Sequence, residues 1–248
     1  MSAERTCPGL FITGTDTGVG KTLVTAALAR HYHRRGLKVG VMKPCETGVA
    51  DTSQPGEDAR LLRWAAGSCD DDQAIAPYRL KEPLAPSLAA ERAGVVIDPR
   101  HIADNLAKIR TGKDLVLVEG AGGLMVPLRG GYLMADLVRE LELPLYVVSR
   151  ASLGTINHTL LTIFAARAME LPVAGFMINR MPSKPGIAEQ EAPHQLASLA
   201  SADLFGVLPE VAGSAEDRVE QLAEAIGRLP TLPWLNNCLG IPAATSTH

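Results

Sequence analysis

The most informative segment of this sequence is Gly14-Thr15-Asp16-Thr17-Gly18-Val19-Gly20-Lys21-Thr22. It follows a short apolar run at residues 10–13 and precedes an amphipathic stretch at 21–35, so it predicts a turn between a strand and a helix. Backbone N–H groups at a helix N-terminus favour phosphate, and glycines let the backbone approach it closely. Lys21 can reach the β- and γ-phosphates of a nucleotide there, and the Thr22 hydroxyl can bind Mg²⁺. The usual phosphate-binding motif has glycine where Thr15 stands, so the match is to the second half of that motif.

Further apolar runs predict five more strands, at residues 38–42, 115–118, 145–148, 173–178 and 204–208. Amphipathic segments predict helices at 21–35, after Asp98-Pro99, at 155–170 and at 215–229. Strands that are apolar on both faces are typical of a parallel sheet covered by helices. The sequence therefore predicts an α/β fold of the P-loop NTPase type, a mostly parallel, doubly wound sheet with helices on both faces. We expect one domain over residues 1–248, with a core at about 8–229 and a C-terminal tail at 230–248.

The composition argues against several classes of protein. Hydrophobic residues make up 46% of the 248 positions, too many for a disordered chain. The net charge is −3, and the basic stretch at 31–35 is explained as the end of a helix, so we expect no nucleic-acid partner. No uncharged apolar stretch reaches the roughly 18 residues of a membrane span, and the first residues are polar, so we expect a cytoplasmic protein without a membrane partner. The cysteines are scattered and predict neither a disulfide framework nor a zinc ribbon: Cys7, Cys45, Cys69 and Cys238.

Two more motifs follow predicted strands directly. The first is Lys43-Pro44-Cys45-Glu46-Thr47-Gly48, in which Lys43 can stabilise negative charge on a transferred phosphoryl group. The second is Glu119-Gly120-Ala121-Gly122-Gly123, in which Glu119 stands where phosphoryl-transfer enzymes place a carboxylate linked to Mg²⁺. On spacing alone, Asp58 is explained more simply as an acidic residue at a helix N-terminus than as a metal ligand. Neither a Gly-x-Ser-x-Gly nor a Gly-x-Gly-x-x-Gly motif is present, which argues against a serine hydrolase and a dinucleotide oxidoreductase.

These three motifs, in this order, resemble those of the dethiobiotin synthetase family. The resemblance runs from about Phe11 to about Val211 and continues through residues 153–158, 175–179 and 206–209. It implies a Mg-ATP-dependent ligase that closes the ureido ring of dethiobiotin from 7,8-diaminononanoate and CO₂. The implied route passes through a carbamate and a carbamic–phosphoric anhydride and releases ADP and phosphate.

The resemblance also assigns roles to individual residues. Lys43 and Lys21 would be catalytic, and Mg²⁺ would be held by Thr22, Asp58 and Glu119. The nucleotide would be bound by Gly18, Val19, Gly20, Lys21, Thr22, Leu23, Asp58, Glu119, Gly120, Ala121, Gly122, Asn179, Pro209, Glu210 and Val211. The diamine would be bound by Thr17, Lys43, Thr47 and Asn157. Asn157 would reach the substrate of a neighbouring subunit, which implies a homodimer with its sites at the interface.

Two points depart from the family pattern. Some members of the family carry glutamate where this chain has Gly18, so a contact made by that carboxylate does not carry over. The segment at residues 181–201 aligns poorly with the family, and no cross-subunit substrate contact is assigned to it.

Two other functions stay open at this point. A cobyrinate-type synthetase also activates a carboxylate by phosphorylation, but it usually carries an additional amidotransferase domain, for which 248 residues leave no room. A nucleotide-switch ATPase would act on a protein partner. The partition and septum-site ATPases carry lysine where this chain has Asp16, and no amphipathic membrane-binding tail follows, so this alternative is disfavoured.

Overall fold

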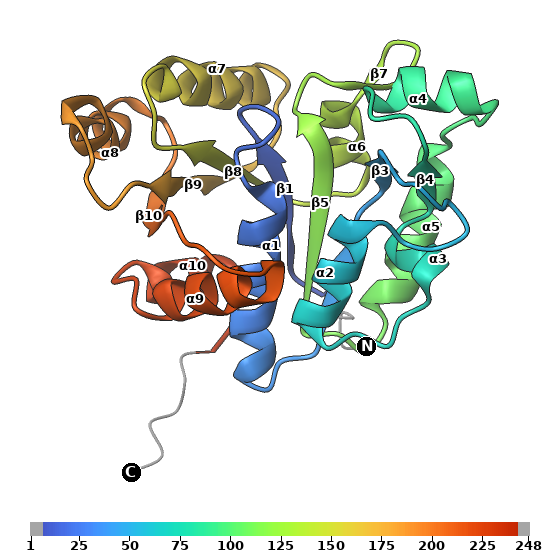
Figure 1. Cartoon of the computed structure of the whole chain (residues 1–248), viewed down its shortest axis with the longest axis horizontal. Coiled ribbons are helices and arrows are strands. Elements are labelled where there is room, and N and C mark those ends of the chain that lie inside the picture. Colours follow the sequence, from blue (N-terminus) through green and yellow to red (C-terminus); the bar gives the residue numbers. More distant parts are fainter. Residues whose placement is uncertain (1–6, 243–248) are drawn as a thin grey trace, which may run out of the picture.

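The computed structural model describes residues 7–242, and its centre is a six-stranded sheet with every strand parallel (Figure 1). The strands lie in the order β10-β9-β8-β1-β5-β2. Their bounds are β1 Gly9–Gly14, β2 Val39–Met42, β5 Leu115–Gly123, β8 Leu145–Arg150, β9 Val173–Met181 and β10 Leu204–Pro209. All six strands predicted from apolar runs are therefore present, and the predicted α/β fold is confirmed.

Helices cover both faces of the sheet, and the alternation of side chains along β1 shows why both faces are apolar. Leu10 and Ile12 point into one hydrophobic cluster, whereas Phe11 between them belongs to the other. The first cluster is covered by α1 Lys21–Arg34, α2 Glu57–Ala66, α9 Ala215–Gly227 and α10 Leu232–Cys238 (Figure 1). The second is covered by α4 Pro86–Ala93, α5 Pro99–Arg110, α6 Met134–Glu140, α7 Thr155–Ala168 and α8 Ile187–Leu199.

The predicted helices are found, but the sequence did not reveal the elements between β2 and β5. The helix expected after Asp98-Pro99 is α5, and Asp98 caps it by accepting a hydrogen bond from the N–H of Arg100 at 3.0 Å. Between β2 and β5 the chain also forms α2, α4, a short helix and a small parallel sheet. These short elements are α3 Asp72–Ile75, β3 Cys45–Thr47 and β4 Tyr78–Leu80. A hairpin of β6 Pro127–Arg129 and β7 Tyr132–Leu133 follows β5.

The described part of the C-terminal tail, residues 230–242, packs against the core. Its helix α10 buries Leu235 against the cluster that contains α1 and α9. The buried phenol of Tyr32 on α1 donates a hydrogen bond to Oδ1 of Asn236 at 2.9 Å. The predicted tail residues 243–248 lie outside the described part of the chain. Between residues 7 and 242, no helix is both long and apolar enough to cross a membrane.

Replacing Tyr32 with Phe tests how firmly the tail is attached. The variant leaves the buried Asn236 amide without its partner, so we expect the free energy of unfolding to fall by about 1–3 kcal/mol. The measurement is equilibrium unfolding in urea. Adding Asn236→Leu to Tyr32→Phe should recover part of this loss, because no polar group is then left unpaired. Strictly additive losses in the double variant would show that the pair does not act as described.

Candidate functional site

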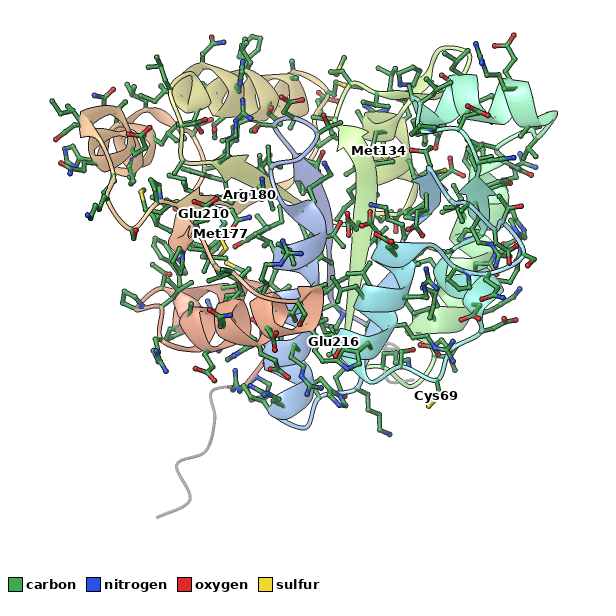
Figure 2. All side chains as sticks on the ribbon, in the orientation of Figure 1. Cys69, Met134, Met177, Arg180, Glu210 and Glu216 are labelled. Atoms are coloured by element: carbon green, nitrogen blue, oxygen red, sulfur yellow. The ribbon has the colours of Figure 1, made fainter. Side chains whose placement is uncertain are left out.

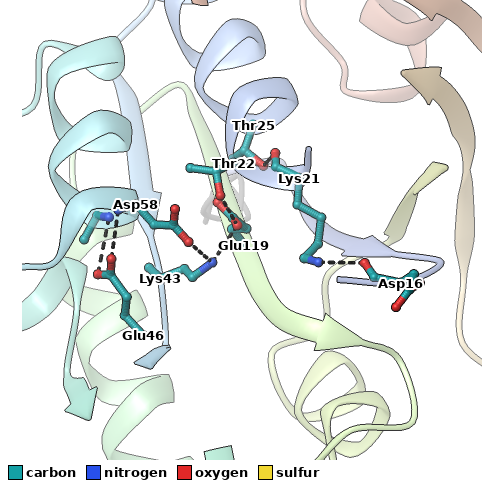
Figure 3. A network of polar contacts seen from close by, with 9 residues as sticks. Asp16, Lys21, Thr22, Thr25, Lys43, Glu46, Asp58 and Glu119 are labelled. Carbon is teal, nitrogen blue, oxygen red and sulfur yellow. Dashed lines mark hydrogen bonds and ion pairs between the residues drawn. The ribbon is translucent and has the colours of Figure 1, made fainter. Parts of the chain in front are cut away.

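The glycine-rich turn occupies the space between β1 and α1, as the sequence predicts. Gly18 and Gly20 have φ angles of 71° and 91°, which are left-handed conformations that favour glycine. The Lys21 ammonium folds back over the turn and donates to the carbonyl of Asp16 at 3.1 Å (Figure 3). A Cβ added to Gly14 would lie 2.8 Å from the carbonyl oxygen of Asp16 and from a methyl carbon of Val19, and 3.0 Å from Nζ of Lys21, so glycine at this position lets the turn pack closely over the end of β1. Gly14 stands one position before the usual glycine of the motif, and its small size has a steric role here.

A network of charged groups lies next to this turn (Figure 3). Nζ of Lys43 is 2.6 Å from Oε1 of Glu119 and 2.8 Å from Oδ2 of Asp58. The Thr22 hydroxyl donates to the same Oε1 of Glu119 at 2.8 Å. Sheet register explains the meeting of Lys43 and Glu119, because Met42 pairs with Val118 on the adjacent parallel strand. Asp58 joins them from the first turn of α2.

Lys43 and Glu119 are buried, whereas the Asp58 side chain is 40% exposed, and the three charges depend on one another. Burial favours the neutral amine of Lys43, but the carboxylates of Glu119 and Asp58 outweigh it and raise the pKa of that lysine. Burial raises the pKa of Glu119, although Lys43 opposes the shift. Burial also acts to raise the pKa of Asp58, but the charge of Lys43 outweighs it and the pKa is lowered. Burial lowers the pKa of Lys21, so this ammonium would gain from an anionic ligand.

One oxygen of Glu119 has no partner among the described residues. Oε2 is buried and receives no hydrogen bond, which is costly for a carboxylate. Together with the Thr22 hydroxyl and the Asp58 carboxylate it forms a set of oxygen donors, the kind that Mg²⁺ prefers. Within residues 7–242 no group of three or more His, Cys, Asp or Glu side chains could hold a metal alone. These donors therefore fit a Mg²⁺ ion that takes its remaining ligands from water or phosphate.

A cavity of about 450 Å³ opens over the network and the glycine-rich turn. Most of the residues assigned from the sequence line it: Thr17, Gly18, Gly20, Lys21, Thr22, Leu23, Lys43, Thr47, Asp58, Glu119, Ala121 and Gly122. Six further residues line the cavity to which the sequence analysis assigned no role: Cys45, Glu57, Leu61, Arg180, Ala215 and Arg218. Arg180 directly follows Asn179 at the end of a strand, and that position was a signal for it. Nothing in the sequence distinguishes Arg218 from the other charged residues on the surface of α9.

The other assigned residues do not line this cavity. Asn179 is buried against the turn and donates from Nδ2 to the carbonyl of Val19 at 3.0 Å, while its Oδ1 is buried without a partner. Gly120 lies on β5 and is buried. Pro209, Glu210 and Val211 end β10 and follow it; Figure 2 shows Glu210 beside Arg180, and the Glu210 N–H donates to the Met181 carbonyl at 2.8 Å.

Asn157 does not line this cavity. It is exposed in the first turn of α7. The cross-subunit contact predicted for it needs a second copy of the chain and stays a prediction.

Solved structures share the fold at low sequence identity. A ParA family ATPase from Chlorobium tepidum superposes with a TM-score of 0.57 at 13% identity, over 92% of this chain and 98% of that one. The MinD cell division protein of Aquifex aeolicus gives 0.56 at 16% identity, over 94% and 95% of the two chains. These two likenesses establish the fold only.

Sequence comparison identifies much closer relatives. A family model described as an AAA domain matches residues 8–218. The ATP-dependent dethiobiotin synthetase of Thermodesulfovibrio yellowstonii is 40% identical over 225 residues, which are 87% of this chain and 94% of that protein. The enzyme of the same name from Bacillus velezensis is 37% identical over 214 residues, 86% of this chain and 91% of that protein. The chain therefore belongs to the family of ATP-dependent dethiobiotin synthetases.

Proposed function

We propose that this protein is the ATP-dependent ligase that closes the ureido ring of dethiobiotin from 7,8-diaminononanoate and CO₂. The observation that carries the proposal is the buried Lys43 ammonium, held by Glu119 and Asp58 in the cavity that Lys21 also lines. Two lysines and a glycine-rich turn at one cavity suit a phosphoryl transfer, in which negative charge must be stabilised. The membership of the dethiobiotin synthetase family supports the choice of substrate.

The proposed reaction has three steps. One amine of the substrate adds to CO₂ and loses a proton, which gives a carbamate. A carbamate oxygen then attacks the γ-phosphorus of ATP, the bond to ADP breaks, and a carbamic–phosphoric anhydride forms. The second amine attacks the carbonyl carbon, phosphate leaves, and loss of a proton gives the cyclic urea. Phosphorylation is needed because a carbamate is a poor electrophile without a leaving group.

The residues of the cavity support distinct roles in this reaction. Lys21 and the N–H groups of residues 18–23 would bind the phosphates, and Lys43 would bind the carbamate and the γ-phosphate. Thr22, Asp58 and Glu119 would hold Mg²⁺, which would neutralise phosphate charge when bound. Thr17 and Thr47 line the same cavity and would bind the diamine.

The adenine base would lie beyond the phosphates, near the end of β9. The unpartnered Oδ1 of Asn179 supports this placement, because it is a buried acceptor that an adenine amino group could satisfy. Pro209, Glu210 and Val211 would line the base site, since the backbone at Glu210 is hydrogen-bonded to the end of β9.

The same proposal includes a homodimer. Large apolar side chains are exposed on α7 and just before it: Leu161 and Phe164 lie on the helix, and Leu153 precedes it by two residues. A second copy of the chain would cover this surface and bring its Asn157 towards the neighbouring substrate. Sedimentation velocity should then give the mass of a dimer, and a monomer at micromolar concentration would contradict this part of the proposal.

A product assay tests the substrate assignment. Purified protein is mixed with 7,8-diaminononanoate, bicarbonate and Mg-ATP, and the products are followed by mass spectrometry. We expect a species that has gained CO₂ and lost water, formed in step with ADP. ATP hydrolysis without this species would contradict the assignment and favour a nucleotide switch or another carboxylate-activating enzyme.

Replacing Lys43 with Ala tests the catalytic lysine. We expect kcat to fall about 10²–10³-fold, because the contact of Lys43 with the transferred phosphoryl group strengthens in the transition state. The affinity for ADP should change much less. The matched control is Lys108→Ala, which removes an exposed lysine on α5. Near-normal turnover of a folded Lys43→Ala protein would remove Lys43 from the catalytic residues.

A further inference from the structure

Glu46 is a buried carboxylate that the proposed chemistry does not use. It lies on β3 and is only 5% exposed. Its Oε1 accepts a hydrogen bond from the backbone N–H of Asp58 at 2.8 Å, and its Oε2 accepts a longer one from the N–H of Ala59 at 3.4 Å (Figure 3). A residue from a different element thus satisfies two of the N–H groups at the start of α2, which have no partner within the helix.

The start of α2 is shaped around this carboxylate. The N-cap residue is Gly56, which has no side chain to cap the helix. Its φ of −73° is open to any residue, so the backbone conformation does not explain the glycine. A Cβ at this position would lie 2.2 Å from Oε1 of Glu46, which does explain it. Glycine at position 56 therefore leaves room for the side chain of Glu46.

Helix capping alone is a poor explanation for this arrangement. A serine or aspartate at the N-cap would satisfy the same N–H groups without a buried charge from another strand. Glu46 is only 5% exposed, and removing a carboxylate from water is costly even when it accepts hydrogen bonds. The N–H that it binds at 2.8 Å belongs to Asp58, whose own carboxylate is 2.8 Å from Lys43. The contact therefore fixes the backbone of a residue whose side chain belongs to the charged network.

We propose that Glu46 is a positioning residue, which holds Asp58 where its carboxylate can bind both Lys43 and the metal ion. This inference rests on the magnesium site of the proposed function. It predicts that loss of Glu46 weakens metal binding even though Glu46 itself touches neither the metal nor the substrates.

The test is the effect of Mg²⁺ on ADP binding, measured by calorimetry with Mg²⁺ and with EDTA. The ratio of the two dissociation constants gives the enhancement by the metal, without any turnover. In Glu46→Ala we expect this enhancement to fall about 10-fold, as for other residues that orient metal ligands, with metal-free ADP binding unchanged. Glu46→Gln should keep most of the enhancement, because its side-chain oxygen still accepts the Asp58 N–H. Gly56→Ala keeps the charge of Glu46 but displaces the carboxylate, so it should lose the enhancement as well.

Two further variants calibrate the measurement. Glu119→Gln removes a proposed ligand and sets the loss expected for a damaged metal site. Asp98→Ala removes a helix cap from α5, away from the cavity, so it should lower the melting temperature and leave the enhancement intact. Thermal melting of each variant identifies any that fails to fold. If Glu46→Ala does not fold, the Mg²⁺ enhancement of ADP binding measured in Gly56→Ala tests the positioning role instead.

The possible results separate this inference from the proposal on which it rests. A wild-type enhancement that survives in folded Glu46→Ala but not in Glu119→Gln would overturn the positioning role alone. An equal loss in Glu46→Gln and Glu46→Ala would show that the charge matters and not the hydrogen bond, which also overturns it. If Mg²⁺ has no effect on ADP binding by the wild-type protein, the magnesium site itself is wrong and this inference fails with it.

Discussion

Glu119 places a fully buried carboxylate halfway along β5, one of the inner strands of the sheet. Taking such a charge out of water costs several kcal/mol unless it is paired and hydrogen-bonded. Lys43 and Thr22 supply the pairing, from the end of β2 and the first turn of α1. Asp58 then binds the same lysine from α2. The burial of one carboxylate thus depends on four elements meeting at one point, and that point is the floor of the cavity.

The order of the strands makes this meeting possible. The chain passes from β1 to β2 at the edge of the sheet and then inserts β5 between them. Because the strands are parallel, the carboxyl ends of β1, β2 and β5 lie on the same side of the sheet, and the segments that follow these strands begin there. The segments after β1 and β2 carry the glycine-rich turn and Lys43, and the last four residues of β5 itself contain the glycines that follow Glu119. The chain then continues on the far side of β1 with β8, β9 and β10, which bring Asn179 against Val19. The strand order therefore places the residues proposed to bind phosphate and those proposed to bind the base on different strands of the sheet.

The sequence predicts these features where one local pattern is enough. A run such as residues 115–118, apolar at every position and only four residues long, favours a strand buried on both faces, and Glu119 directly follows it. Asp58 is different, because its place depends on a cap that comes from another strand and not from the residue before the helix. The tail is also hard to predict, since the seven residues of α10 offer too short an apolar pattern. Arg218 shows the same limit, because a charged residue on a helix surface gives no sign that it faces a cavity. Contacts between elements that are distant in the sequence are therefore the features of the fold and the site that local sequence patterns do not predict.

The geometry of Lys43 explains how one residue can both stabilise the fold and take part in the proposed reaction. A lysine ammonium has three N–H donors, and two of them are engaged by Glu119 and Asp58. The third is available to a substrate oxygen, because Lys43 lines the cavity. The two carboxylates also raise the pKa of Lys43, so the amine stays protonated despite its burial. A protonated amine stabilises negative charge that develops nearby better than a neutral amine does. The groups that make the buried lysine tolerable to the fold therefore also keep it protonated for the role proposed for it.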